Sequence, residues 1–242
     1  MPIRAVFFDM GDTLVYSDNL RQNFVERIHS ILAKHVEIDR EDIAKAFGNW
    51  DSVPYRVGLE EHSDELRIML LLKRVGLPPA PTLVKELREA VVKIWVESYV
   101  FEEDAAPTLS RLKDEGYIVG IISNAGSYDI VEGKLEEGGL LELVDVVVVS
   151  EAIAWKKPSP VIFRVAVDMV GVEPSEAVHV GDNPVADIEG AKRAGLWAIQ
   201  KLKPGVGPSP YADYAVTRIE DVPAVIRKLN ELLSSEACGD KA

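Results

Sequence analysis

The chain has 242 residues, 47% of them hydrophobic, which is enough apolar material to bury a sizeable core. Its 40 acidic residues outnumber its 27 basic residues, and the resulting net charge of -13 argues against binding to nucleic acid or anionic membranes. A single cysteine, Cys238, excludes an internal disulfide, and neither a signal peptide nor a membrane-length apolar run is evident. We therefore expect a cytoplasmic protein with no nucleic-acid or membrane partner, as a monomer or homodimer.

The first predicted strand is followed directly by charged residues. In "VFFDMGDTLVYSD", residues 6–18, an apolar run leads directly into Asp9 and Asp12. Like charges this close repel each other, and an unpaired buried carboxylate is costly. The sequence therefore predicts a cationic partner for this strand end.

Residues 17–99 show helical periodicity and lack strand-like runs. The apolar stripes cover residues 19–35, 64–76 and 82–99. The "PPAP" segment at 78–81 should separate the last two helices. In the irregular stretch before residue 64, we consider substrate contacts for Trp50, Tyr55 and Arg56, although packing is the simpler role.

From about residue 100 onward, short β-branched runs alternate with helix-sized segments. Strands are predicted at residues 117–123, 144–150, 177–182, 196–200 and 213–216. Helices are predicted at residues 107–116, 159–171 and 184–195, each ending on a glycine suited to a left-handed cap. This alternation predicts an α/β fold: a doubly wound, Rossmann-like parallel sheet formed by residues 1–16 and 100–242, with residues 17–99 inserted as an all-helical domain.

Polar residues follow four of the predicted strands. Ligands of open parallel sheets bind beyond the carboxyl ends of the strands, so these residues define a candidate site. They are Asp9, Gly11, Asp12 and Thr13; Ser123 and Asn124; Lys156 and Lys157; and Asp182, Asn183 and Asp187. Carboxylates without histidine or cysteine companions suit Mg2+, and a lysine and a hydroxyl suit phosphate oxygens. An aspartate facing phosphorus can act as a nucleophile, so a metal ion is the expected cationic partner.

Four segments, "FFDMGDTL", "IISNAGS", "KKPSPVIF" and "HVGDNPVADIEGAKRAG", resemble in order and spacing the four motifs of the haloacid dehalogenase superfamily. Magnesium-dependent phosphatases dominate that superfamily. The resemblance spans the whole predicted core. Residues 17–99 resemble the helical cap of the family, which closes over the site and selects the substrate.

The resemblance assigns a role to each matching residue. Asp9 becomes the nucleophile and a metal ligand, with the carbonyl of Gly11, Asp182 and Asp187 completing the metal site. Ser123 becomes a phosphate hydrogen-bond donor, and Asn124 and Thr13 are placed beside the phosphate, with Thr13 also supporting the turn after Asp9. Lys157 becomes the residue that orients Asp9 and neutralises charge; it is preferred to Lys156 because it directly precedes Pro158.

One position departs from the family pattern. Phosphatases of the family usually carry a second aspartate two residues after the nucleophile, as general acid, and this chain has Gly11 there. Asp12 is displaced by one residue, which on an extended strand end points its side chain the other way. The loss of a positioned acid ordinarily costs about 10²–10⁴ in rate.

The sequence thus predicts a magnesium-dependent phosphohydrolase that acts on a small phosphorylated metabolite through an aspartyl-phosphate on Asp9. A haloacid dehalogenase or a phosphonate hydrolase that uses the same aspartate is the enzymatic alternative. A phosphate-binding or regulatory protein, weakened as a catalyst by Gly11, is the alternative from a different class.

Overall fold

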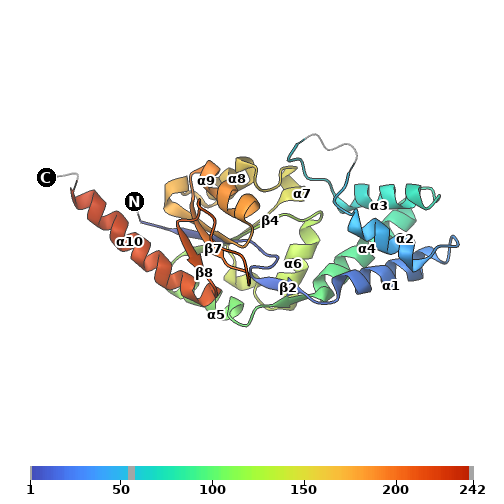
Figure 1. Ribbon diagram of the computed structural model, residues 1–242, viewed down its shortest axis with the longest axis horizontal. Coiled ribbons are helices and arrows are strands. Elements are labelled where there is room, and N and C mark those ends of the chain that lie inside the picture. The colour runs from blue at the N-terminus through green and yellow to red at the C-terminus, as the bar shows by residue number, and fades with distance from the viewer. Residues whose placement is uncertain (1, 54–57, 240–242) are drawn as a thin grey trace.

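The computed structural model describes residues 2–53 and 58–239, and Figure 1 shows a sheet-containing body on one side and a group of helices on the other. Two of the residues considered for substrate contacts, Tyr55 and Arg56, lie outside the described residues. In the part of the chain that is described, no helix is both long and apolar enough to cross a membrane.

A six-stranded sheet forms the core of the larger body, in the order β5-β4-β1-β6-β7-β8. Every neighbouring pair in it is parallel. The strands are β1 (Ala5–Phe8), β4 (Ile118–Ser123), β5 (Val146–Val149), β6 (Ala177–Gly181), β7 (Trp197–Lys201) and β8 (Tyr214–Val216). Each predicted strand is present. Because the chain builds the sheet outward from β1 first on one side and then on the other, the strand order reverses between β1 and β6, where a ligand site is expected.

Strand β1 shows why the sheet strands are apolar on both sides. Val6 and Phe8 belong to one hydrophobic cluster, and Ala5 and Phe7 belong to a second cluster on the opposite face. Helices α5 (Ala105–Asp114), α6 (Tyr128–Glu137) and α10 (Val222–Gly239) contribute to the first cluster, and α8 (Pro160–Val170) and α9 (Gly190–Ala194) contribute to the second. The predicted doubly wound, Rossmann-like α/β fold is therefore confirmed.

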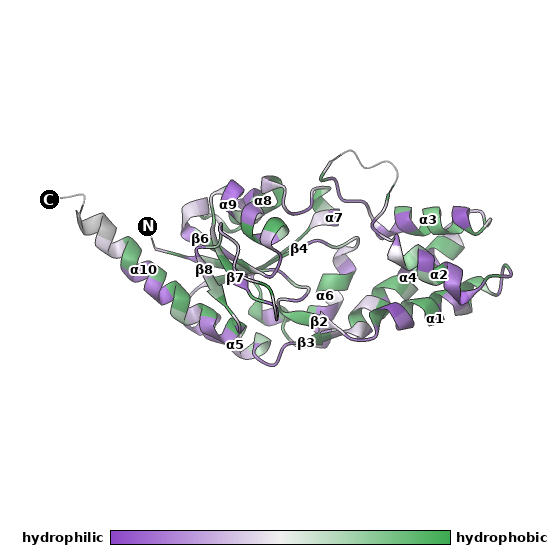
Figure 2. Ribbon diagram, viewed as in Figure 1, coloured by the Kyte–Doolittle hydropathy of each residue, from purple (hydrophilic) through white to green (hydrophobic). Residues whose placement is uncertain are grey.

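In the described part of residues 17–99, four helices form the body inserted after the first sheet strand. They are α1 (Leu20–Leu32), α2 (Arg40–Gly48), α3 (Asp64–Arg74) and α4 (Pro81–Ser98), and they share a hydrophobic cluster of their own. In Figure 2 these helices carry hydrophobic and hydrophilic residues along their length, as amphipathic helices do. Helix α2 was not predicted from the sequence.

A short antiparallel ladder joins the two bodies. Strand β2 (Val15–Ser17) leads out of the sheet toward α1, and β3 (Tyr99–Phe101) brings the chain back after α4. Neither strand was predicted, because three residues carry too little periodicity to be recognised. The ladder places the ends of the helical segment side by side, with Ser17 opposite Tyr99.

Candidate active site

Asp9 directly follows β1, and the local backbone fixes its position. Its N–H donates a hydrogen bond to the carbonyl of Val180 in the neighbouring strand at 2.9 Å. After it the chain turns sharply, since the amides of Leu14 and Val15 both bond the carbonyl of Met10. Thr13 is fully buried, and its hydroxyl lies 3.4 Å from Asp9 Oδ2, beside the carboxylate as its expected supporting role requires.

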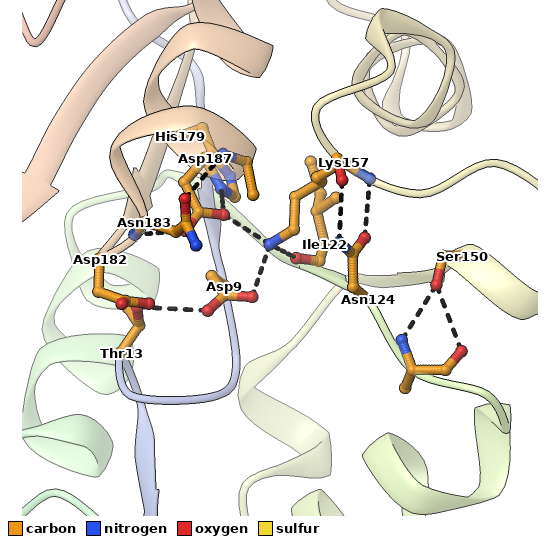
Figure 3. A network of polar contacts seen from close by, with 12 residues as sticks. Asp9, Thr13, Ile122, Asn124, Ser150, Lys157, His179, Asp182, Asn183 and Asp187 are labelled. Atoms are coloured by element: carbon orange, nitrogen blue, oxygen red, sulfur yellow. Dashed lines mark hydrogen bonds and ion pairs between the residues drawn. The ribbon is translucent and has the colours of Figure 1, made fainter. Parts of the chain in front are cut away.

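Lys157 is the direct cationic partner of this carboxylate. Its Nζ lies 2.5 Å from Asp9 Oδ1, 2.6 Å from Asp187 Oδ1 and 2.8 Å from the carbonyl oxygen of Ile122 (Figure 3). These three acceptors satisfy all three ammonium hydrogens, which fixes the side chain. Burial opposes the charge, but the carboxylates of Asp187 and Asp9 outweigh it and raise the pKa of Lys157.

Asp187 is almost completely buried and is held from several sides. Besides Lys157, it accepts hydrogen bonds from the backbone N–H of Asn183 at 2.9 Å and from His179 Nε2 at 3.1 Å. Burial lowers the pKa of His179, so this imidazole is neutral and donates from Nε2. Burial works against the charge of Asp187 as well, but Lys157 and His179 keep its pKa below the ordinary value. Asp187 is thus a fixed anion.

Gly181, the last residue of β6, makes room for that anion. A Cβ at this position would lie 2.3 Å from Asp187 Cγ, a distance that no ordinary van der Waals contact allows. Only a glycine lets Asp187 sit against the strand. The helix predicted over residues 184–195 begins here with a π-helical segment, Pro184–Glu189, before α9. Asn183 caps this segment by accepting hydrogen bonds from the amides of Val185 and Ala186.

Asp182 brings a third carboxylate to the same point. Oxygen atoms of Asp9, Asp182 and Asp187 all lie within 4.8 Å of one another, which is close to the separation of about 4 Å between opposite oxygen ligands of one Mg2+. The set contains oxygen donors only, as a hard cation prefers. The residues present therefore fit a magnesium ion. The Gly11 carbonyl, which the motif adds to this set, belongs to the turn that follows Asp9.

The charge balance of the three carboxylates supports the same conclusion. Burial is the main cause that raises the pKa of Asp9, to about 7; Lys157 opposes this shift, and the charges of Asp187 and Asp182 add to it. Burial also raises the pKa of Asp182. Lys157 contacts Asp9 and Asp187, and Lys203 contacts Asp182 and Asp12. Two ammonium groups therefore face four carboxylates, and the excess negative charge favours one more cation.

Asp12, the acid displaced by one residue from position 11, is paired with a lysine. Its backbone is left-handed, with φ of 57°, and its exposed carboxylate pairs with Lys203 Nζ at 2.7 Å. The same ammonium group lies 2.6 Å from Asp182 Oδ2. Sequence reasoning missed Lys203, although it stands two residues after β7 and the rule that examines strand ends could have found it.

Ser123 and Asn124 end strand β4, on the other side of β1. Ser123 is buried, at 5% exposed. The side chain of Asn124 forms a reciprocal pair with the backbone of Lys157: Oδ1 accepts from the amide at 2.8 Å, and Nδ2 donates to the carbonyl at 3.1 Å (Figure 3). This pair ties the Lys157 loop to the β4 end. The phosphate contacts expected of both residues stay a prediction.

A cavity of about 470 Å3 lies between the helical segment and the β4 end. Its lining includes Trp50, Tyr99, Asn124, Ala125 and Gly126. Trp50, one of the residues considered for a substrate contact, therefore does face the cavity.

The same cavity exposes part of a buried charge network that sequence reasoning missed. The guanidinium of Arg67 lies 2.7 Å from Glu61, 3.2 Å from Asp64 and 3.1 Å from Asp51. Glu61 in turn accepts a hydrogen bond from Ser150, across from the helical segment to the core. Of the three carboxylates, Glu61 lies nearest to Arg67, and its pKa is lowered although burial opposes this, whereas burial raises the pKa of Asp64 to about 6.

The model of a known family, described as a haloacid dehalogenase-like hydrolase, matches residues 3–195. The chain belongs to this family. The resemblance found in the motifs is therefore confirmed, and the protein is a hydrolase. A glyceraldehyde 3-phosphate phosphatase of Methanopyrus kandleri is 32% identical over 227 residues, which cover 91% of each chain.

Solved structures of the family share the fold along almost the whole chain. A phosphatase of the family from Thermococcus onnurineus is 24% identical, with a TM-score of 0.72 over 93% of this chain and 98% of its own. A 2-haloacid dehalogenase from Pseudomonas syringae is 22% identical, with a TM-score of 0.73 over 94% of this chain and 99% of its own. Because a phosphatase and a dehalogenase match equally well, the fold alone does not choose between these reactions.

Proposed function

We propose that the protein is a magnesium-dependent phosphohydrolase that acts on a small phosphorylated metabolite. The observation that carries this proposal is the convergence of Asp9, Asp182 and Asp187, the first and last of them bound to Lys157, at the point where the strand order reverses. The phosphatase name of the Methanopyrus kandleri relative supports phosphate esters as substrates.

In this proposal each residue of the site has a defined role in the reaction. One oxygen of Asp9 attacks phosphorus and forms an aspartyl-phosphate, which water then hydrolyses. Lys157 holds the other oxygen in place and neutralises charge, and Ser123 donates a hydrogen bond to the phosphate. Asp9, Asp182, Asp187 and the Gly11 carbonyl hold Mg2+. When bound, this ion would shield the repulsion between the phosphate and the carboxylates.

We propose in addition that residues 17–99 form a cap domain that selects the substrate. Two observations support this: the four helices share a core of their own, and the cavity is lined from both bodies. The proposed substrate places its phosphate at Asp9 and its organic part in the cavity, whose volume suits a small metabolite.

The carboxylate cluster also bears on the enzymatic alternatives. Displacement of a halide from carbon by an aspartate requires no metal ion. A dehalogenase reaction therefore does not explain why Asp182 and Asp187 lie beside Asp9. Gly11 favours a second candidate, a protein that binds Mg2+ and phosphate without turnover, because it removes the usual general acid.

A panel of phosphate esters, assayed with Mg2+ and with a chelator, tests the proposal. We expect hydrolysis that requires Mg2+ and falls at least about 10³-fold in Asp9→Asn, because the amide is a poor nucleophile. Asp12→Asn is the matched control, since its carboxylate is exposed and, among the described residues, forms an ion pair with Lys203 alone, and it should keep most of the activity. Tight phosphate binding without turnover on any ester would instead support the binding protein.

A further inference from the structure

Tyr99 occupies the space beside the missing acid. Among the described residues other than the chain neighbours of Gly11, its hydroxyl is the one atom within about 4 Å of a Cβ built at Gly11, at 4.0 Å. Carboxylate oxygens lie about 2.4 Å from their Cβ, so an aspartate side chain at position 11 is long enough to reach the Tyr99 hydroxyl. The hydroxyl therefore faces the region from which the family acts on the leaving group.

The position of Tyr99 is set by the joint between the two bodies. It begins β3, pairs with Ser17 of β2, and packs its ring against Trp95 of α4 with centroids 5.6 Å apart. It also lines the cavity proposed for the organic part of the substrate. Tyr99 thus stands where the two parts of a phosphate ester would meet.

The hydroxyl is available as a donor. It makes no hydrogen bond with any residue that the structure describes, although its side chain is largely enclosed. Burial, with the charges of Asp9 and Asp12 adding to it, raises the pKa of Tyr99. The phenol therefore remains protonated at neutral pH.

We propose that the Tyr99 hydroxyl donates a hydrogen bond to the leaving-group oxygen of the substrate, in the place of the acid that Gly11 lacks. This inference rests on the proposed phosphohydrolase function. As the Asp9 oxygen bonds to phosphorus, the bond from phosphorus to the leaving oxygen breaks and its electron pair stays on that oxygen. The hydrogen bond stabilises this charge, and the oxygen then takes a proton from water.

The contribution should depend on the leaving group. An alkoxide develops a full, localised charge and needs the donor, whereas p-nitrophenolate spreads its charge over the ring and needs it little. Tyr99→Phe, which keeps the ring and removes the hydroxyl, isolates this contact. We expect kcat on glycerol phosphate to fall about 10- to 100-fold, and kcat on p-nitrophenyl phosphate to change by less than about threefold.

Tyr16→Phe is the matched control. Tyr16 lies in the same ladder, opposite Val100, and its side chain is 44% exposed. The Tyr16→Phe substitution should leave the hydrolysis rates of both esters unchanged. A loss in Tyr99→Phe that is equal on the two esters, or absent on both, overturns the inference while the proposed function stands.

A second variant, Gly11→Asp, tests whether the Tyr99 hydroxyl and an acid at position 11 act on the same leaving-group oxygen. In Gly11→Asp, a carboxyl group enters the space beside the hydroxyl, so adding Tyr99→Phe should cost less than about threefold on glycerol phosphate. An undiminished loss in that background overturns the inference, because the two groups would then act independently. If the unaltered protein hydrolyses neither ester, the proposed function fails and the inference fails with it.

Discussion

The ammonium group of Lys157 lies 2.5 Å from the carboxylate of Asp9, although 148 positions separate the two residues in the chain. The contact joins the end of β1 to the loop that follows β5, across the end of β4, which lies between these two strands in the sheet. It holds the Asp9 carboxylate beside those of Asp182 and Asp187.

Removal of this ammonium should damage both stability and activity. Lys157→Met leaves the buried carboxylates of Asp9 and Asp187 without their partner, and a broken buried pair costs about 3–5 kcal/mol. We expect a clear loss in the free energy of unfolding, measured by urea denaturation, together with loss of ester hydrolysis. Lys45→Met, at an exposed lysine that pairs with Glu41, should change neither. A Lys157→Met protein as stable as the original would contradict the assigned contact.

Gly181→Ala should disturb the proposed metal site without substituting any of its ligands. The new Cβ would lie 2.3 Å from Asp187 Cγ and push that carboxylate aside. Since groups that orient metal ligands typically matter by 10- to 100-fold, the Mg2+ concentration for half-maximal activity should rise by about tenfold or more. Gly207→Ala is the control, because a Cβ there meets nothing within 4 Å. Identical Mg2+ dependence in both variants would argue against Asp187 at the site.

The Arg67 network should make stability depend on pH. Burial raises the pKa of Asp64 to about 6 in the folded protein, from 3.8. The folded state then holds a proton that the unfolded state releases, so this contribution is complete below pH 4 and is lost as pH rises through 6. Between pH 4 and pH 7 the loss should amount to up to about 3 kcal/mol.

Asp64→Asn provides the comparison for this prediction, since an amide has no proton to lose. The difference in unfolding free energy between the two proteins should shift in favour of Asp64→Asn as pH increases across this range. A difference that does not change with pH would show that Asp64 keeps an ordinary pKa in the folded protein.

Gly11→Asp should raise the hydrolysis of esters with poor leaving groups. Apart from the Tyr99 hydroxyl at 4.0 Å, no described atom outside the two neighbouring residues lies within 4 Å of a new Cβ there, so the Cβ is accommodated. We expect a gain of about tenfold or more in kcat on alkyl phosphates and a smaller gain on p-nitrophenyl phosphate, because only the former need protonation. Equal gains on both esters would remove the explanation that rests on the missing acid.

The sheet and its carboxyl edge could be predicted from the sequence for a physical reason. A strand buried on both faces must be apolar at every position, so runs such as the one ending at Ser123 stand out. Parallel strands bring their carboxyl ends to one edge, which is why Asp9, Lys157, Asp182 and Asp187 could be grouped before any contact was known.

The parts that escaped prediction depend on long-range packing. Strands β2 and β3 exist because the helical segment returns to its starting point, and neither carries a pattern of its own. In the sequence, Tyr99 and Arg67 look like ordinary residues near the ends of amphipathic helices. The cavity that both line forms only where the helical segment packs against the core. The contact of Asp12 with Lys203 could not be predicted, because it depends on a left-handed backbone conformation that the sequence does not indicate.

The central claim is that phosphate passes through the side chain of Asp9. Rapid acid quenching of the protein during turnover of a labelled phosphate ester, followed by peptide mapping, measures this directly. We predict a Mg2+-dependent phosphoryl label on the peptide that contains Asp9, and none in Asp9→Asn. Turnover without a label on that peptide, or with the label on another residue, would contradict the account.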